Sequence, residues 1–138
     1  ITEERKKNLA DFEAGYATEE QVKQTIHDLY TDTGYVIDTH TAVAASVYNE
    51  YRKNTGDTAK TVIASTASPY KFARSVMTAI DASYDAMEEF ELIDELHKVS
   101  QMDIPNAIEE IRNAEIRHTT ECDIDQMEAS VKAVLGVV

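Results

Sequence analysis

The feature that most constrains this chain is a short apolar run, Val62 to Ala64, followed by a cluster of hydroxyl residues. The run lies between a turn-rich segment, Asn54 to Asp57, and Pro69, which is the pattern of a strand buried on both faces. A helical repeat of apolar positions then begins at Phe72. A strand, a polar loop and a helix in this order predict an α/β fold, in which ligands bind at the carboxyl end of the strand.

Length and charge exclude several classes of function. The 138 residues suffice for one domain, and no apolar run approaches the ~20 residues that span a bilayer. The single cysteine, Cys122, has no internal disulfide partner and fits a reducing cytosol.

The net charge of −13 is concentrated in residues 81–138, which hold 4 basic and 15 acidic residues. This charge argues against nucleic acids and anionic membranes as partners, because both would be repelled.

Apolar positions at helical spacing predict a helix-rich chain. Thr18 and Gln21 form a capping-box pattern in front of one apolar stripe, and Asp38 or Thr39 can cap the next helix. That second helix is apolar or small on nearly every face, which predicts burial on several sides. The predicted helices cover about residues 19–32, 39–53, 72–80, 87–101, 104–112 and 124–136.

Only two strands are predicted, over residues 61–65 and 115–120. The second rests on a weak alternation of apolar and polar residues. Two strands among so many helices make a poor self-contained sheet. The chain is therefore expected to be part of a larger α/β fold.

Two segments resemble the threonine synthase family. Residues Gly34–Ala44, GYVIDTHTAVA, are similar to that family's G-Y-x-[IL]-D-x-H-T-A-V-A segment. Residues Val62–Phe72, VIASTASPYKF, resemble its S-T-A-[HS]-P-x-K-F strand and loop. The order and spacing agree over roughly residues 10–138. Ser68 stands where many members have His, and Thr39 where many have Pro, so no role is assigned to position 68.

The resemblance implies a lyase that uses pyridoxal phosphate (PLP) to convert O-phosphohomoserine and water into threonine and phosphate. It also implies a three-layer, tryptophan-synthase-β-like fold with the cofactor between two α/β domains. The Schiff-base lysine and the cofactor-phosphate loop lie earlier in such chains, and neither is recognisable here. Residues 1–138 are therefore expected to be the C-terminal portion of a cytoplasmic threonine synthase. The rest of that chain would be their partner, and they would be inactive alone.

By its position in the motif, Thr66 matches the residue whose hydroxyl faces the pyridine nitrogen of PLP in this fold. Such a hydroxyl tunes the ring as an electron sink without doing the bond-breaking. Ser65 is a weaker candidate for the same role. The alternative is that both side chains only bond the backbone of their own loop.

Two further residues are candidates for contact with the substrate or its surroundings. His40 is either a polar residue near the substrate or a buried histidine satisfied by Asp38. Lys71 precedes a predicted helix N-terminus, which favours anions, so the hypothesis is a contact with the substrate phosphate. A solvated or structural lysine is the alternative.

Other readings of the sequence stay open. His118, Cys122 and Asp123 lack a second pair to complete a zinc site, so no metal is predicted. One alternative to the enzyme is a free-standing anion-binding or regulatory α/β module that uses the loop Ser65–Lys71 as its site and performs no catalysis. Another is an interaction domain. That domain, like a severed enzyme, would expose apolar surface and self-associate.

Overall fold

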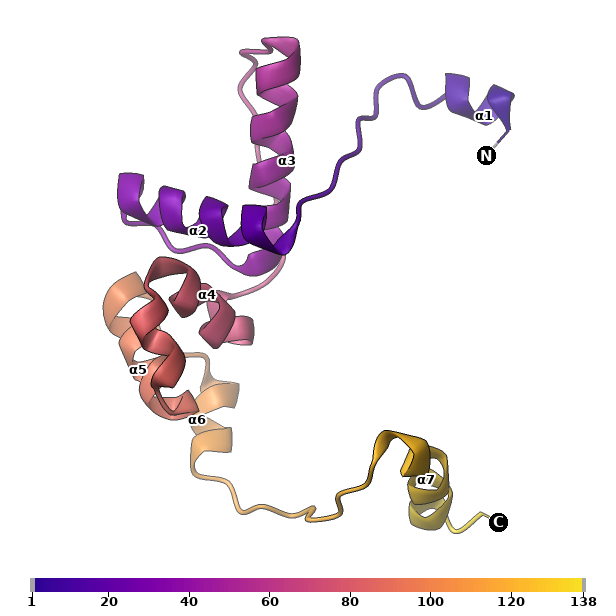
Figure 1. Ribbon diagram of the computed structural model, residues 1–138, viewed down its shortest axis with the longest axis vertical. Helices are drawn as coiled ribbons and strands as arrows, with labels where there is room; N and C mark the ends of the chain where they lie inside the picture. The colour runs from indigo at the N-terminus through magenta and orange to yellow at the C-terminus, as the bar shows by residue number, and fades with distance from the viewer. Residues whose placement is uncertain (1, 138) are drawn as a thin grey trace. The chain divides into compact units, whose positions relative to one another are not determined.

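The computed structural model describes residues 2–137, and every regular element in that range is a helix (Figure 1). The chain divides into two compact units, Ile1–Asn106 and Ala107–Val138. No helix in the described range is long and apolar enough to cross a membrane. The helices are α1 (Glu3–Lys7), α2 (Glu19–Thr33), α3 (Thr39–Thr55), α4 (Ala73–Ile80), α5 (Glu89–Ser100), α6 (Asn106–Arg112) and α7 (Met127–Leu135).

The predicted capping box begins α2. The Thr18 hydroxyl accepts a hydrogen bond from the Gln21 amide at 3.3 Å, and the Gln21 side chain accepts one from the Thr18 amide at 2.8 Å. Gly34 ends the helix with φ of 73°, a left-handed conformation that glycine adopts without a Cβ penalty. The helix is therefore defined at both ends by its own sequence.

The core of the first unit lies where α4 packs against α2 and α5. Val76 and Met77 of α4 are fully buried there, as are Ile26 of α2 and Leu92 and Leu96 of α5. Each such side chain contributes about 1.5–3 kcal/mol by leaving water. This packing holds α2 and α4 in place, and with them one side of the site described below.

The predicted strand over residues 61–65 is wrong for residues 2–137 by themselves. These residues form no regular element, and Val62 is 93% exposed instead of buried. A strand needs a neighbouring strand to pair its backbone N–H and C=O groups, and residues 2–137 contain none. The predicted strand over residues 115–120 is wrong for the same reason, since that segment is irregular and every residue in it is exposed.

The helix predicted over residues 72–80 is α4, which begins one residue later than predicted. A 3₁₀ helix, Pro69–Phe72, precedes α4, and the Ser68 hydroxyl caps it by accepting a hydrogen bond from the Tyr70 amide at 3.3 Å. The last predicted helix is likewise a 3₁₀ turn, Ile124–Gln126, followed by α7. The predicted start at residue 104 lies two residues before α6.

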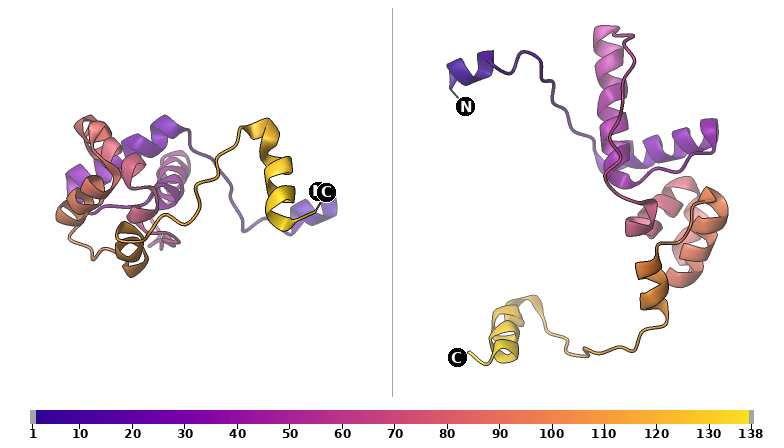
Figure 2. Two further views of the ribbon diagram at one scale, coloured as in Figure 1. Left: turned by 90° about the horizontal axis from the view of Figure 1, so that it is seen from below. Right: turned by 180° about the vertical axis from the view of Figure 1, so that it is seen from behind.

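α3 is less buried than its sequence predicts. Of its 17 residues only Thr41 and Ala42, in the first turn, are buried. The segment after α3 runs back beside the helix (Figure 2) and is tied to it by a hydrogen bond from the Tyr51 hydroxyl to Asp57, at 3.1 Å. The small residues of α3 therefore leave much of its surface uncovered by the described residues.

Candidate functional site

The candidate site is built around the buried carboxylate of Asp38, which caps the N-terminus of α3 and is 1% exposed. Its Oδ1 accepts hydrogen bonds from the backbone amides of His40 at 2.8 Å and Thr41 at 3.3 Å. Its Oδ2 accepts one from the Thr41 hydroxyl. Asp is a preferred N-cap because its carboxylate satisfies amides that have no partner within the helix.

The pKa of Asp38 is held below its ordinary value. Burial alone would raise this pKa, since burial penalises the charged form. The hydrogen bonds from Thr41 and His40 outweigh burial, because they stabilise the carboxylate and not the acid. Asp38 is therefore a fixed negative charge at neutral pH.

Ser65 joins this network from 24 residues along the chain. Its Oγ lies 3.0 Å from the Thr41 Oγ1, within hydrogen-bond distance. The Thr41 hydroxyl has one proton and directs it to Asp38, so Ser65 supplies the proton of this second bond. The network thereby anchors the loop that follows the segment beside α3.

Thr66, the next residue, lies outside the network. Its side chain is exposed and makes no hydrogen bond with any residue that the structure describes. The backbone-bonding alternative does not describe Ser65, whose hydroxyl bonds a side chain. Ser65 and Thr66 thus differ: one hydroxyl is engaged and the other is free.

His40 contacts the same carboxylate. Its Nδ1 lies 3.0 Å from Asp38 Oδ1, and its ring lies against Phe72 with centroids 5.6 Å apart. A neutral imidazole must donate from Nδ1 to this carboxylate, so its Nε2 is the free acceptor. The side chain is 51% exposed, so His40 is satisfied by Asp38 without being a buried histidine.

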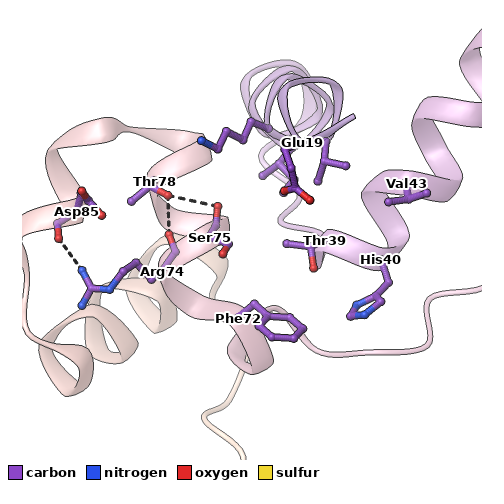
Figure 3. Close-up of a pocket in the computed structure, with 12 residues that line it drawn as sticks. Glu19, Thr39, His40, Val43, Phe72, Arg74, Ser75, Thr78 and Asp85 are labelled. Carbon is purple, nitrogen blue, oxygen red and sulfur yellow. Dashed lines mark hydrogen bonds between the residues drawn. The ribbon is translucent and has the colours of Figure 1, made fainter. Parts of the chain in front are cut away.

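A cleft of about 570 Å³ lies beside His40, between α2, α3 and α4 (Figure 3). Figure 3 shows Glu19, Thr39, His40 and Phe72 around it. Lys23 of α2 and Ser75 and Thr78 of α4 also line it. The cleft therefore combines an aromatic ring, hydroxyls and charges of both signs.

Lys71 is placed elsewhere. It lies in the 3₁₀ helix with its Nζ 5.5 Å from the centroid of the Phe72 ring, and it does not line the cleft. This cation–π contact is worth about 0.5–1 kcal/mol at an exposed position. The structure thus brings Ser65 and His40 together through Asp38, and leaves Thr66 and Lys71 outside that cluster.

Sequence reasoning missed Glu19 and Lys23 as site residues. They are four residues apart on one face of α2, a spacing that signals a shared surface. The spacing alone does not predict which other helices this surface faces, because α2 packs on α3 and α4 through contacts between residues that are distant in sequence. Asp38 was recognised as a helix cap and as a partner of His40, but not as the residue that binds the Thr41 hydroxyl, which in turn bonds Ser65.

Comparison with known protein families gives a match that covers part of the site. A family model described as "Threonine synthase, C-terminal" matches residues 41–134. The matched range includes Thr41, Ser65 and Thr66 and extends through α7. No curated protein matches the chain.

Proposed function

Because this chain belongs to the threonine synthase family through its C-terminal domain, we propose that it works as part of a PLP-dependent lyase in the cytoplasm. The proposed reaction converts O-phosphohomoserine and water into threonine and phosphate. The match over residues 41–134 carries this proposal. Residues 2–137 contain helices and no strand, which suits part of a larger three-layer fold, because the exposed segment around Val62 lacks the neighbouring strands that such a fold would supply.

The residues of this chain fit one end of the cofactor. The free hydroxyl of Thr66 suits a pyridine nitrogen, since it can donate a hydrogen bond without delivering a full charge. The chain offers no glycine-rich cradle for the cofactor phosphate, since three of its four glycines end helices and Gly15 packs against Val47. We propose that the phosphate loop and the reactive lysine belong to another part of a longer polypeptide.

PLP, when bound, supplies the electron sink of the reaction. The contribution of this chain is positional. Ser65, held by Thr41 and Asp38, fixes the backbone directly before Thr66. Thr66 would then present its hydroxyl to the ring nitrogen and keep that nitrogen neutral, where a carboxylate would hold a proton on it.

Phosphate release from O-phosphohomoserine tests the proposal, in the polypeptide that carries this chain in its source. Thr66→Val removes the hydroxyl and keeps the shape, so we expect kcat/KM to fall about 5- to 100-fold, the equivalent of one lost hydrogen bond. Thr66→Ser keeps the hydroxyl and should stay near wild type. Thr58→Val, at an exposed position of the same segment, is the matched control.

Two outcomes would count against the proposal. A Thr66→Val enzyme with unchanged turnover and unchanged PLP absorption would remove the role of Thr66. A polypeptide that neither binds PLP nor releases phosphate would remove the reaction itself. If it instead bound phosphate with an affinity that depends on Lys71, the anion-binding alternative would replace the lyase.

A further inference from the structure

The hydrogen bonds between Asp38, Thr41 and Ser65 run in one direction. The buried Asp38 carboxylate is ionised and can only accept, and its Oδ2 accepts the proton of the Thr41 hydroxyl. That hydroxyl has no second proton, so toward Ser65 Oγ, 3.0 Å away, Thr41 is the acceptor. The protons therefore point from Ser65 to Thr41 and from Thr41 to Asp38.

This direction makes two neighbouring hydroxyls chemically different. The proton of Ser65 is directed to Thr41, which leaves Ser65 only lone pairs for any other group. The hydroxyl of Thr66 forms no hydrogen bond with any residue that the structure describes, so it keeps its proton for an external acceptor. Of these two hydroxyls, only that of Thr66 can donate to a group such as a pyridine nitrogen.

We propose that Asp38 and Thr41 are positioning residues of the lyase: they make the Ser65 hydroxyl an acceptor and thereby reserve donation to the cofactor nitrogen for Thr66. This inference rests on the proposed function, which assigns Thr66 to that nitrogen. A pyridine nitrogen offers one lone pair, so a second donor beside Thr66 would compete for it. The network removes this competition while it holds the backbone before Thr66.

Asp38→Asn should reverse the direction of the hydrogen bonds without removing the helix cap. Three donors converge on Oδ1, which are the amides of His40 and Thr41 and the Nδ1 of His40, so the side-chain oxygen of asparagine takes this place. Its NH2 group then faces the Thr41 hydroxyl and donates to it. Thr41 in turn donates to Ser65, whose own proton is released. Asparagine caps helices as well as aspartate does, so the fold stays intact.

Exchange of hydroxyl protons with water, followed by NMR in the 138-residue chain at low temperature, tests this direction without the cofactor. In wild type we expect the Ser65 proton to exchange at least fivefold more slowly than the Thr66 proton, because only the former is hydrogen-bonded. Asp38→Asn and Thr41→Val should both bring Ser65 to the rate of Thr66. Thr41→Ser keeps the hydroxyl and should behave like wild type. Asp32→Asn, the same change at an exposed position of α2, is the matched control.

In the longer polypeptide, the same substitution separates positioning from stability. Asp38→Asn should lower kcat for phosphate release about 5- to 10-fold and leave KM within about twofold, because the competing donor acts at the cofactor and not on the substrate. The absorption of bound PLP should shift, while the thermal midpoint stays near that of Asp32→Asn. A merely structural role of Asp38 would instead lower the thermal midpoint and leave the absorption of the folded enzyme unchanged.

Fast exchange of the Ser65 proton in wild type, or equal Ser65 exchange in Asp38→Asn and Asp32→Asn, would overturn the inference. Unchanged kcat and PLP absorption in Asp38→Asn, in an enzyme that Thr66→Val impairs, would overturn the inference alone and leave the proposed function standing. A polypeptide that releases no phosphate, although Ser65 exchanges as expected, would overturn the proposed function. The direction of the hydrogen bonds would then stand, and its assignment to a lyase would not.

Discussion

At the residue scale, Asp38 carries more interactions than any other side chain of the site. Replacing it with alanine removes the N-cap of α3 and leaves the Thr41 hydroxyl without its acceptor. We expect Asp38→Ala to lower the free energy of unfolding by about 2 kcal/mol, the upper range for a lost cap. Urea unfolding followed by circular dichroism measures this. Asp32→Ala, at an exposed end of α2, should change stability by less than about 0.5 kcal/mol.

The lowered pKa of Asp38 also predicts a loss of stability in acid. The unfolded carboxyl titrates near 3.8, and the folded one titrates at a lower pH. Its stabilisation is therefore complete above the unfolded pKa and disappears as the pH falls through the folded pKa. Urea midpoints measured from pH 6 downward should fall less steeply for Asp38→Asn than for wild type. Parallel curves for the two proteins would show that Asp38 is not the group responsible.

Tyr70 predicts the opposite pH dependence. Its hydroxyl donates to the Met102 carbonyl at 2.6 Å, which ties the 3₁₀ helix to the residues after α5. Burial raises the pKa of Tyr70 above 10.0, the negative charge of Asp103 adds to this, and the Ser100 hydroxyl partly offsets it. Stability from Tyr70 is therefore complete below the unfolded pKa and is lost as the pH rises through the folded pKa.

Tyr70→Phe should cost about 1 kcal/mol at neutral pH, the net value of one hydrogen bond. The variant should also lose less stability than wild type between neutral pH and strongly alkaline pH. Thermal unfolding at several pH values measures both effects. Tyr35→Phe, at an exposed position, is the control. An alkaline loss of the same size in Tyr70→Phe would assign that loss to other groups.

At the element scale, the segment around Val62 should be exposed and unpaired in this chain alone, and buried and paired in a larger fold. In this chain Val62 is exposed, so Val62→Asp should change the free energy of unfolding by less than about 0.5 kcal/mol. The same substitution at the buried Val76 should cost more than about 3 kcal/mol, because it places a charge in the core of α4.

The amides of residues 61–65 should also exchange freely with solvent in the 138-residue chain. In the longer polypeptide of the proposed function they should be protected, because neighbouring strands would then accept their hydrogen bonds. Hydrogen exchange read by mass spectrometry compares the two. Fast exchange in both would argue against a strand at this position in any context.

The elements that could be predicted from the sequence are those whose determinants are local. The capping box of Thr18 and Gln21 and the left-handed Gly34 lie within or next to the helix they define, and both are present. The two strand predictions were wrong because a strand depends on pairing partners that are distant in sequence. The link between Ser65 and Thr41 was missed for a similar reason, since it spans 24 residues. Motif position identified Ser65 as a candidate, and the neighbouring Asp38 and helix start identified His40. Only the fold shows that Asp38 and Thr41 connect the two.

At the scale of the whole molecule, a large negative charge accompanies an apolar helix surface that the described residues leave uncovered. The net charge is −13, and Met127, Val131, Val134 and Leu135 of α7 are all exposed. They lie on one side of the helix by their spacing, which is the pattern of a surface that packs against another apolar surface. Mutual repulsion of the acidic chains opposes such packing, and salt screens that repulsion.

We therefore expect the chain to self-associate through α7, and to do so more strongly as the salt concentration rises. Replacing both Val131 and Val134 with Glu should leave a monomer at concentrations where wild type associates, as measured by sedimentation velocity. Replacing Ala129 and Ala133 with Glu adds the same charge to the opposite side of α7 and should leave association intact. If both double variants lost association equally, charge alone would explain the result and the apolar side of α7 would not be the contact.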